Sequence, residues 1–112
     1  MAKEDEYNRG MELFAEGKLD EAIVAYRKAL KEDTNFADCL HALSMALAHQ
    51  DRLDEAIEVG KQLIEVSPDD ELAYTSLSIF YQRKGMIPEA EEVGAKARTL
   101  GWKRQLQEKK AK

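Results

Sequence analysis

The side chains best suited to bind a metal or carry out catalysis are one cysteine and two histidines, Cys39, His41 and His49. On one helix, His41 and His49 share a face but lie two turns apart, roughly 12 Å along the axis at 1.5 Å per residue. Because His–zinc bonds are about 2 Å long, this pair is too far apart to hold one metal ion unaided. Cys39 and His41 are two residues apart and point to different faces. We therefore expect no metal site.

Adjacent carboxylates are the other candidates for chemistry, as general acids or bases. Examples are the pairs Asp20-Glu21, Asp54-Glu55, Asp69-Asp70 and Glu91-Glu92. Each pair lies at a predicted helix start or on a solvated face, where negative charge interacts favourably with the helix dipole. There is no phosphate-binding loop and no nucleophile motif. We expect neither catalysis nor a cofactor, and we expect Cys39 to be a buried core thiol.

Composition and charge narrow the class of protein. The 112 residues are 44% hydrophobic and 35% charged, which is typical of amphipathic helices in a globular domain. No apolar run approaches the roughly 20 residues that span a bilayer, and there is no secretory signal, which favours the cytoplasm. The chain carries −5 overall, and the segment from Trp102 onward carries +4, which leaves −9 on residues 1–101. An acidic body predicts no nucleic-acid binding, and the basic tail, residues 102–112, is expected to be a soluble, frayed end.

One seven-residue pattern recurs every 34 residues and must position all of these side chains. It reads Gly-Lys-Leu-Asp-Glu-Ala-Ile at 17–23, Asp-Arg-Leu-Asp-Glu-Ala-Ile at 51–57 and Gly-Met-Ile-Pro-Glu-Ala-Glu at 85–91. Each copy combines a tight turn, an apolar residue, an acidic helix start and a small residue where two helices approach closely. A period of this length is typical of stacked supersecondary units.

Apolar residues three and four apart fill the intervals between the turns, which predicts six helices of about 12–15 residues and no strand. Turns of about three to four residues make neighbouring helices antiparallel. Asp20 is predicted to be the N-cap of the second helix. Asn35 is predicted to be the N-cap of the third helix, with Asp38 three residues later completing a capping box. Gly101 is predicted to end the sixth helix, so that Trp102 and Leu106 form the apolar edge of a short, separate helical tail.

The aligned repeats identify a family. Small or apolar residues recur at four sets of matching positions: Gly10, Ser44 and Ser78; Leu13, Leu47 and Tyr81; Ala22, Ala56 and Ala90; Ala29, Leu63 and Ala97. The chain resembles the tetratricopeptide repeat family, with repeats at about 3–36, 37–70 and 71–104 in a single domain of residues 1–112. The resemblance implies an all-α solenoid, a right-handed superhelix of helix pairs. Its first helices line a concave groove that binds segments of other proteins, without catalysis.

Both ends of the chain depart from the repeat pattern. Glu6 and Arg9 stand where the second unit has Leu40 and Leu43, and this polar outer face is typical of an N-terminal cap. At the other end, the short tail is predicted to cover the last helix pair incompletely. An alternative to an adaptor is therefore a structural element that self-associates through its terminal helices, with homo-oligomerisation through the C-terminal end.

The second helices also differ from one another. Gly60 and Gly94 stand where the first unit has the aromatic residue Tyr26. Glycine inside a helix costs about 1 kcal/mol relative to alanine. We expect these two glycines to thin the core or to permit close helix approach.

The family pattern implies a groove formed by side chains of the first helices. Met11, Met45 and Ile79 are 34-residue equivalents and form an apolar row across it. The other seven groove residues are Tyr7, Asn8, Phe14, His41, His49, Thr75 and Gln82. An apolar residue repeated on an exposed face indicates a binding patch, and the methionine thioether suits adaptable recognition. We predict that the groove binds an amphipathic helix or apolar peptide with basic flanks; the alternative is that the row merely completes the core.

The best-known binding chemistry of the family is a carboxylate clamp, in which Lys, Asn and Arg hold the C-terminal carboxylate of heat-shock chaperones. The matching positions here are Tyr7, Met11, Ala42, Leu72 and Ser76. None of them supplies the charge-assisted hydrogen bonds of such a clamp. The resemblance therefore predicts a protein-binding adaptor that does not use it.

Overall fold

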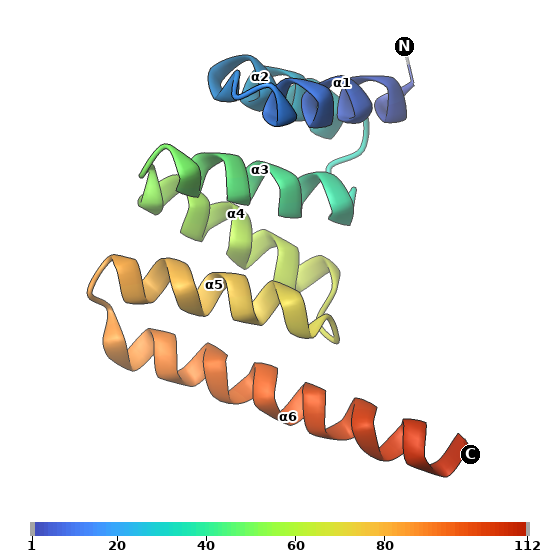
Figure 1. Ribbon diagram of the computed structural model, residues 1–112, viewed down its shortest axis with the longest axis vertical. Helices are drawn as coiled ribbons and strands as arrows, with labels where there is room; N and C mark the ends of the chain where they lie inside the picture. Colours follow the sequence, from blue (N-terminus) through green and yellow to red (C-terminus); the bar gives the residue numbers. More distant parts are fainter. Residues whose placement is uncertain (1, 112) are drawn as a thin grey trace.

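The computed structural model describes residues 2–111, and this range folds into six α-helices, which confirms the predicted all-α solenoid. They are α1 (Lys3–Ala15), α2 (Leu19–Glu32), α3 (Ala37–His49), α4 (Leu53–Val66), α5 (Glu71–Arg83) and α6 (Ile87–Ala111). Each helix packs mainly on the helices that precede and follow it. The stack runs from α1 and α2 at one end to α6 at the other, where the last part of α6 projects beyond α5 (Figure 1).

The turn inside each helix pair repeats one backbone geometry. A residue with positive φ stands at the same place in every unit, Gly17 at 79°, Asp51 at 60° and Gly85 at 81°. The N–H of the following residue then donates to a carbonyl five residues back, in Lys18 to Leu13, Arg52 to Leu47 and Met86 to Tyr81, each at 2.9 Å. This left-handed ending satisfies a carbonyl that the helix terminus would leave without a partner. The 34-residue period of the sequence is therefore also a period of backbone conformation.

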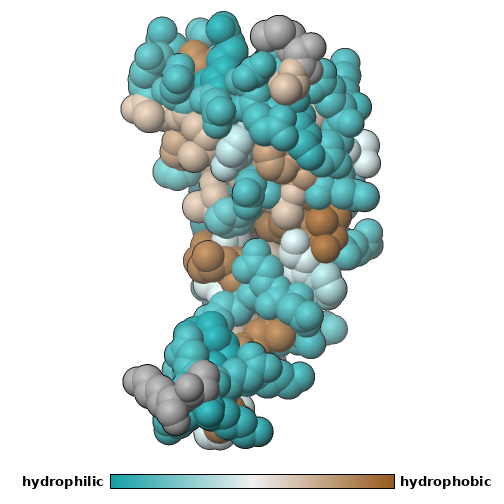
Figure 2. Space-filling model, turned by 90° about the vertical axis from the view of Figure 1, so that its right-hand side faces the viewer, coloured by the Kyte–Doolittle hydropathy of each residue, from teal (hydrophilic) through white to brown (hydrophobic). Residues whose placement is uncertain are grey.

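Small residues set the distance between the helices of the core. The alanines at position 22 and its equivalents, Ala22, Ala56 and Ala90, are almost fully buried. The Ser78 hydroxyl donates to the Ala90 carbonyl at 2.8 Å, so α5 and α6 lie close together. A Cβ at Gly60 would lie 3.0 Å from Leu77 Cδ1, which confirms close approach at that glycine. The outward faces are polar, and Figure 2 shows a largely hydrophilic surface with separate hydrophobic patches.

The predicted helix caps are wrong. α2 begins at Leu19 with Lys18 as its N-cap, and α3 begins at Ala37 with Phe36 as its N-cap; neither side chain makes a cap hydrogen bond. Asp20 lies one residue inside its helix, because the left-handed turn already directs the Lys18 carbonyl to the Ala22 N–H. Asn35 is not a cap either: its own N–H donates to the Asp33 carboxylate at 3.0 Å.

The predicted end of the sixth helix at Gly101 is also wrong, since α6 continues to Ala111 and includes the tail. Gly101 does not adopt the left-handed conformation that ends a helix. It packs against the start of α5 instead, where a Cβ would lie 3.3 Å from Glu71 Oε1. One turn later, Arg104 donates to Glu71 at 3.0 Å and to Glu108 at 3.1 Å. These contacts hold the helix past its glycine, so the tail is not a separate helix.

Candidate partner-binding groove

The three equivalent residues of the apolar row lie on the first helices of the pairs, α1, α3 and α5. Met11 and Ile79 are each 47% exposed, although the repeat places both on helices that pack on two neighbours. Met45, between them in the stack, is half-buried. A large apolar side chain left half in water is energetically unfavourable unless something covers it. The row therefore lies open at the surface rather than inside the core.

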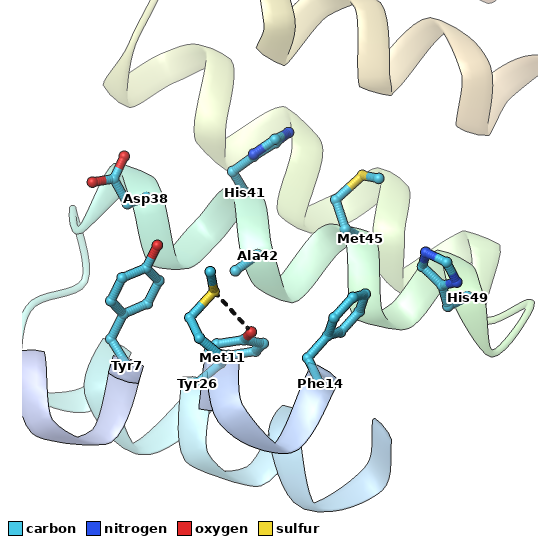
Figure 3. Close-up of a pocket in the computed structure, with 9 residues that line it drawn as sticks. All are labelled: Tyr7, Met11, Phe14, Tyr26, Asp38, His41, Ala42, Met45 and His49. Atoms are coloured by element: carbon cyan, nitrogen blue, oxygen red, sulfur yellow. Dashed lines mark hydrogen bonds between the residues drawn. The ribbon is translucent and has the colours of Figure 1, made fainter. Parts of the chain in front are cut away.

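A pocket of about 330 Å³ lies between α1 and α3 and contains most of the predicted groove residues. Its lining residues are Tyr7, Met11, Phe14, Tyr26, Asp38, His41, Ala42, Met45 and His49. Side chains from α1 and α3 face one another across it (Figure 3). The Phe14 and His49 rings meet edge to face with centroids 5.2 Å apart, which closes one end of the pocket. Apolar and aromatic atoms form most of its wall.

A second pocket of about 260 Å³ continues the groove toward α5. It shares Met45 and His49 with the first pocket and adds Ala48, Ser76, Ile79, Phe80 and Arg83. His41 Nε2 lies 3.3 Å from Ser76 Oγ, a hydrogen bond that connects α3 to α5. The two pockets together form one groove across the three first helices. We call this surface the groove.

Tyr26 lies in the groove although it belongs to α2, and the repeat pattern does not predict it there. Its ring crosses Gly10, where a Cβ would lie only 2.4 Å from Tyr26 Cε1. The hydroxyl donates to Met11 Sδ at 3.4 Å, the contact drawn in Figure 3. Burial raises the pKa of Tyr26 to about 12, so the hydroxyl stays protonated at neutral pH. The aligned repeats do contain a signal for this contact between Gly10 and Tyr26. The first unit combines a glycine on its first helix with an aromatic residue on its second, whereas the second unit combines Ser44 with Gly60.

The structure separates the predicted groove residues into two groups. Seven of them line the two pockets, namely Tyr7, Met11, Phe14, His41, Met45, His49 and Ile79. Asn8, Thr75 and Gln82 are exposed and line neither pocket. The Thr75 hydroxyl donates to the Glu71 carbonyl of its own helix at 3.0 Å. Thr75 instead borders a shallow hollow between α5 and α6 that includes Trp102.

Charge is divided along the groove. Asp38 lines the first pocket at its α3 N-terminal end, and no ion pair involves it among residues 2–111. Burial raises the pKa of Tyr7, and the negative charge of Asp38 raises it further. At the opposite end lie His49 and Arg83, whose guanidinium donates to Asp51 at 3.0 Å. One end of the groove therefore offers a carboxylate without an ionic partner.

Neither a metal-binding cluster nor a membrane-spanning helix is found among the described residues. No three His, Cys, Asp or Glu side chains of residues 2–111 are grouped in a way that could hold a metal ion. None of the helices in this range is long and apolar enough to cross a membrane. Cys39 is fully buried, and its thiol donates to the Tyr26 carbonyl at 3.3 Å, which confirms that it is a core residue.

Solved structures similar to this chain share its fold. A crystal structure of MamA matches with a TM-score of 0.90 and 28% identity, over 93% of this chain and 61% of that one. The second tetratricopeptide repeat domain of Spaghetti (RPAP3), solved with an HSP90 peptide of sequence SRMEEVD, matches with a TM-score of 0.84. That domain is 23% identical over 89% of this chain and 93% of its own.

Sequence comparison leads to the same family. The chain is 32% identical over 82 residues to Protein STIP1 homolog of Dictyostelium discoideum. It is 29% identical over 86 residues to the peroxisomal targeting signal receptor of Yarrowia lipolytica. These matches cover 73% and 76% of this chain but only 14% of each relative. The family model described as tetratricopeptide repeat matches residues 13–79, more than half of the chain. The chain therefore belongs to the tetratricopeptide repeat family, a family of non-catalytic scaffolds for protein–protein interaction.

Proposed function

We propose that this chain is an adaptor whose groove binds a partner segment with a large apolar side chain flanked by basic residues. The observation that carries the proposal is the first pocket, which joins a mostly apolar wall to the unpaired carboxylate of Asp38. Met11 and Met45 are flexible enough to adjust to an apolar side chain placed between them. An apolar anchor in such a pocket contributes most of the affinity.

The charge of the chain supports basic flanks on the partner. Residues 1–101 carry a net charge of −9, and Glu4 lies in the first turn of α1, three residues before Tyr7 of the pocket. Complementary charge of this kind raises the association rate and fixes the direction in which a segment binds. An amphipathic helix with its apolar stripe on the row and cationic residues toward Asp38 satisfies both features.

The ligand proposed here differs from the one seen in the Spaghetti (RPAP3) domain. That peptide, SRMEEVD, carries three carboxylate side chains in its last four residues. In this chain, the positions that match the carboxylate clamp hold no cationic side chain: Tyr7, Met11, Ala42, Leu72 and Ser76. An acidic peptide would also place its charges beside Asp38. We therefore propose binding without the clamp, by a cytoplasmic protein.

The test is a binding assay on peptides that share an apolar anchor and differ only in flanking Lys or Glu. The native chain is compared with Met11→Glu/Met45→Glu/Ile79→Glu. A matched control, Val24→Glu/Ile87→Glu/Leu106→Glu, adds the same charge at exposed apolar positions outside the groove. We expect the native chain and the control to bind the Lys-flanked peptides, and the groove variant to lose them. Equal binding by all three proteins, or preference for Glu flanks, would refute the proposal.

A further inference from the structure

The two ends of the helix stack carry charged residues where the interior of the stack is apolar. In the second helices, Ile23 and Ile57 are buried, whereas the equivalent residue of α6 is Glu91. Leu30 and Ile64 are half-buried, and their equivalent is Arg98. On α1, Glu6 and Arg9 replace Leu40 and Leu43, which are both buried on α3. All four charged residues therefore occupy positions whose equivalents inside the stack are apolar and buried or half-buried.

None of these four side chains forms an ion pair among the described residues 2–111. The ion pairs of the structure join other residues, including Lys3–Asp33, Arg27–Glu55, Lys84–Asp54 and Arg104–Glu71. Glu6 and Arg9 do not bridge each other, although three residues on one helix is a favourable spacing for a bridge. A polar cap is sufficient to keep an end face soluble. Solubility alone does not require the two end faces to carry opposite charges at positions that would meet.

The contacts inside the stack fix which residues would meet if a second copy continued it. Leu30 of α2 lines one crevice with Leu40 and Leu43 of α3. Gly60 of α4 lies against Leu77 of α5, with its Cβ position 3.0 Å from Leu77 Cδ1. The 34-residue period converts these contacts into those expected between the end of one copy and the start of the next. Leu30 corresponds to Arg98 after adding 68, and Leu40 to Glu6 after subtracting 34. Gly60 corresponds to Gly94 after adding 34, and Leu77 to Arg9 after subtracting 68. Arg98 then meets Glu6 of the next copy, and Gly94 meets its Arg9.

This register places Arg98 beside the acidic first turn of α1. Arg98 lies against Glu6 of the next copy, whereas Glu91 falls opposite Glu12 by the same arithmetic, so Arg98 supplies the attraction between the two faces. The net charges of the two end helices also favour this contact. Between Lys96 and Lys110, six cationic residues and one anionic residue give +5. In α1, four anionic and two cationic residues give −2. The end faces lie at opposite ends of the molecule (Figure 1), so such a contact joins copies head to tail.

We infer that the outer face of α6 binds the outer face of α1 of a second copy, through ion pairs of Arg98 with Glu6 and its acidic neighbours in the first turn of α1. Because the two surfaces differ, the contact is open-ended and generates short chains of molecules rather than a closed dimer. Each link continues the solenoid, so the groove of one copy leads into the groove of the next. The ion pairs lie at the surface, and the association is therefore weak and sensitive to salt.

Sedimentation of the full chain at increasing concentration tests this inference. We expect the weight-average mass of the native chain to rise above the monomer value in about 20 mM salt and to return to it in about 500 mM salt. Arg98→Glu and Glu6→Arg should each be monomeric alone, because each makes the two end faces alike in charge. The double variant Glu6→Arg/Arg98→Glu should associate again. An equimolar mixture of the two single variants should also associate, since each contact between unlike variants is complementary.

The controls separate this effect from net charge and from misfolding. Lys28→Glu and Glu65→Arg reverse charge at exposed positions away from both end faces, and both should associate like the native chain. Circular dichroism should show the same helix content in every variant. A native chain that stays monomeric at low salt would overturn the inference, and so would single variants that associate as well as the native chain. Neither result depends on the ligand of the groove.

Discussion

The ring of Tyr26 lies directly across Gly10, so that a Cβ at residue 10 would sit 2.4 Å from Tyr26 Cε1 and 2.5 Å from Cδ1. No real side chain tolerates that distance, and Tyr26 is only 1% exposed, so its ring has little room to move. Through this contact a residue of α2 reaches the groove on α1. The floor of the groove therefore depends on the absence of a side chain at one position.

Gly10→Ser and Tyr26→Gly should be strongly coupled, because together they reproduce the Ser44 and Gly60 pair of the second unit. Gly10→Ser alone should destabilise by about 1–3 kcal/mol through overpacking. Tyr26→Gly alone should cost at least about 3–5 kcal/mol through the cavity it leaves. The double variant should be more stable than the sum of these losses predicts, by about 1 kcal/mol or more. Urea denaturation measures all three, and simple additivity would contradict the prediction.

Gly85 tests the left-handed turn without any packing effect, since a Cβ there would meet nothing within 4 Å. Gly85→Ala should lower the free energy of unfolding by about 1 kcal/mol, because alanine disfavours positive φ. Gly85→Asp should cost less, since Asp51 already adopts this conformation in the second unit. Thermal and urea unfolding report the difference. Equal losses in the two variants would mean that the backbone conformation does not control the effect.

Cys39 should be protected from thiol reagents in the folded protein. Burial raises the pKa of its thiol to about 12, so at pH 8 only about one molecule in 10,000 carries the reactive thiolate. Labelling with a chromogenic disulfide should be slow in buffer and fast in urea, where the pKa returns to its ordinary value near about 8.5. Fast labelling in buffer under stabilising conditions would show that α2 and α3 open readily at this point.

Asp33 should make stability depend on pH in the acid range. The hydrogen bond from Lys3, followed by that from the Asn35 N–H, holds the pKa of Asp33 below its ordinary value. A lowered pKa stabilises the fold above the unfolded value of about 3.9, and this contribution is lost as pH falls through the folded pKa. Asp33→Asn should therefore be less stable than the native chain at pH 7. At pH 2–3 the difference should shrink, and a difference that is independent of pH would exclude this origin.

The repeat phase was predictable because three copies of one pattern leave a single consistent alignment. Six helices, their order, and the buried alanines all follow from it. The end of α6 was not predictable from Gly101 alone, because glycine serves both as a helix terminator and as a point of close packing. Only the contact with Glu71 and the hydrogen bond from Arg104 distinguish the two roles, and both join residues at least 30 positions apart in the sequence.

The site was predictable to a similar degree. Positions on α1 and α3 follow from helical spacing, and six of them meet at the first pocket. Tyr26 was missed because it belongs to a second helix, which the pattern assigns to the opposite layer. Its place in the groove depends on a substitution at another position, Gly10, so no single-residue pattern reveals it.

The arrangement in which each helix contacts mainly its sequence neighbours also determines how the molecule opens. With few contacts between distant repeats, an end unit can unfold while the remaining pairs stay formed. Amide hydrogen exchange should therefore be slowest in α3 and α4, which are packed on both sides, and faster toward both ends. The last part of α6 projects beyond α5 (Figure 1), and its amides should exchange first. Such a gradient would let the chain lose order progressively from its C-terminus while the pocket between α1 and α3 remains intact.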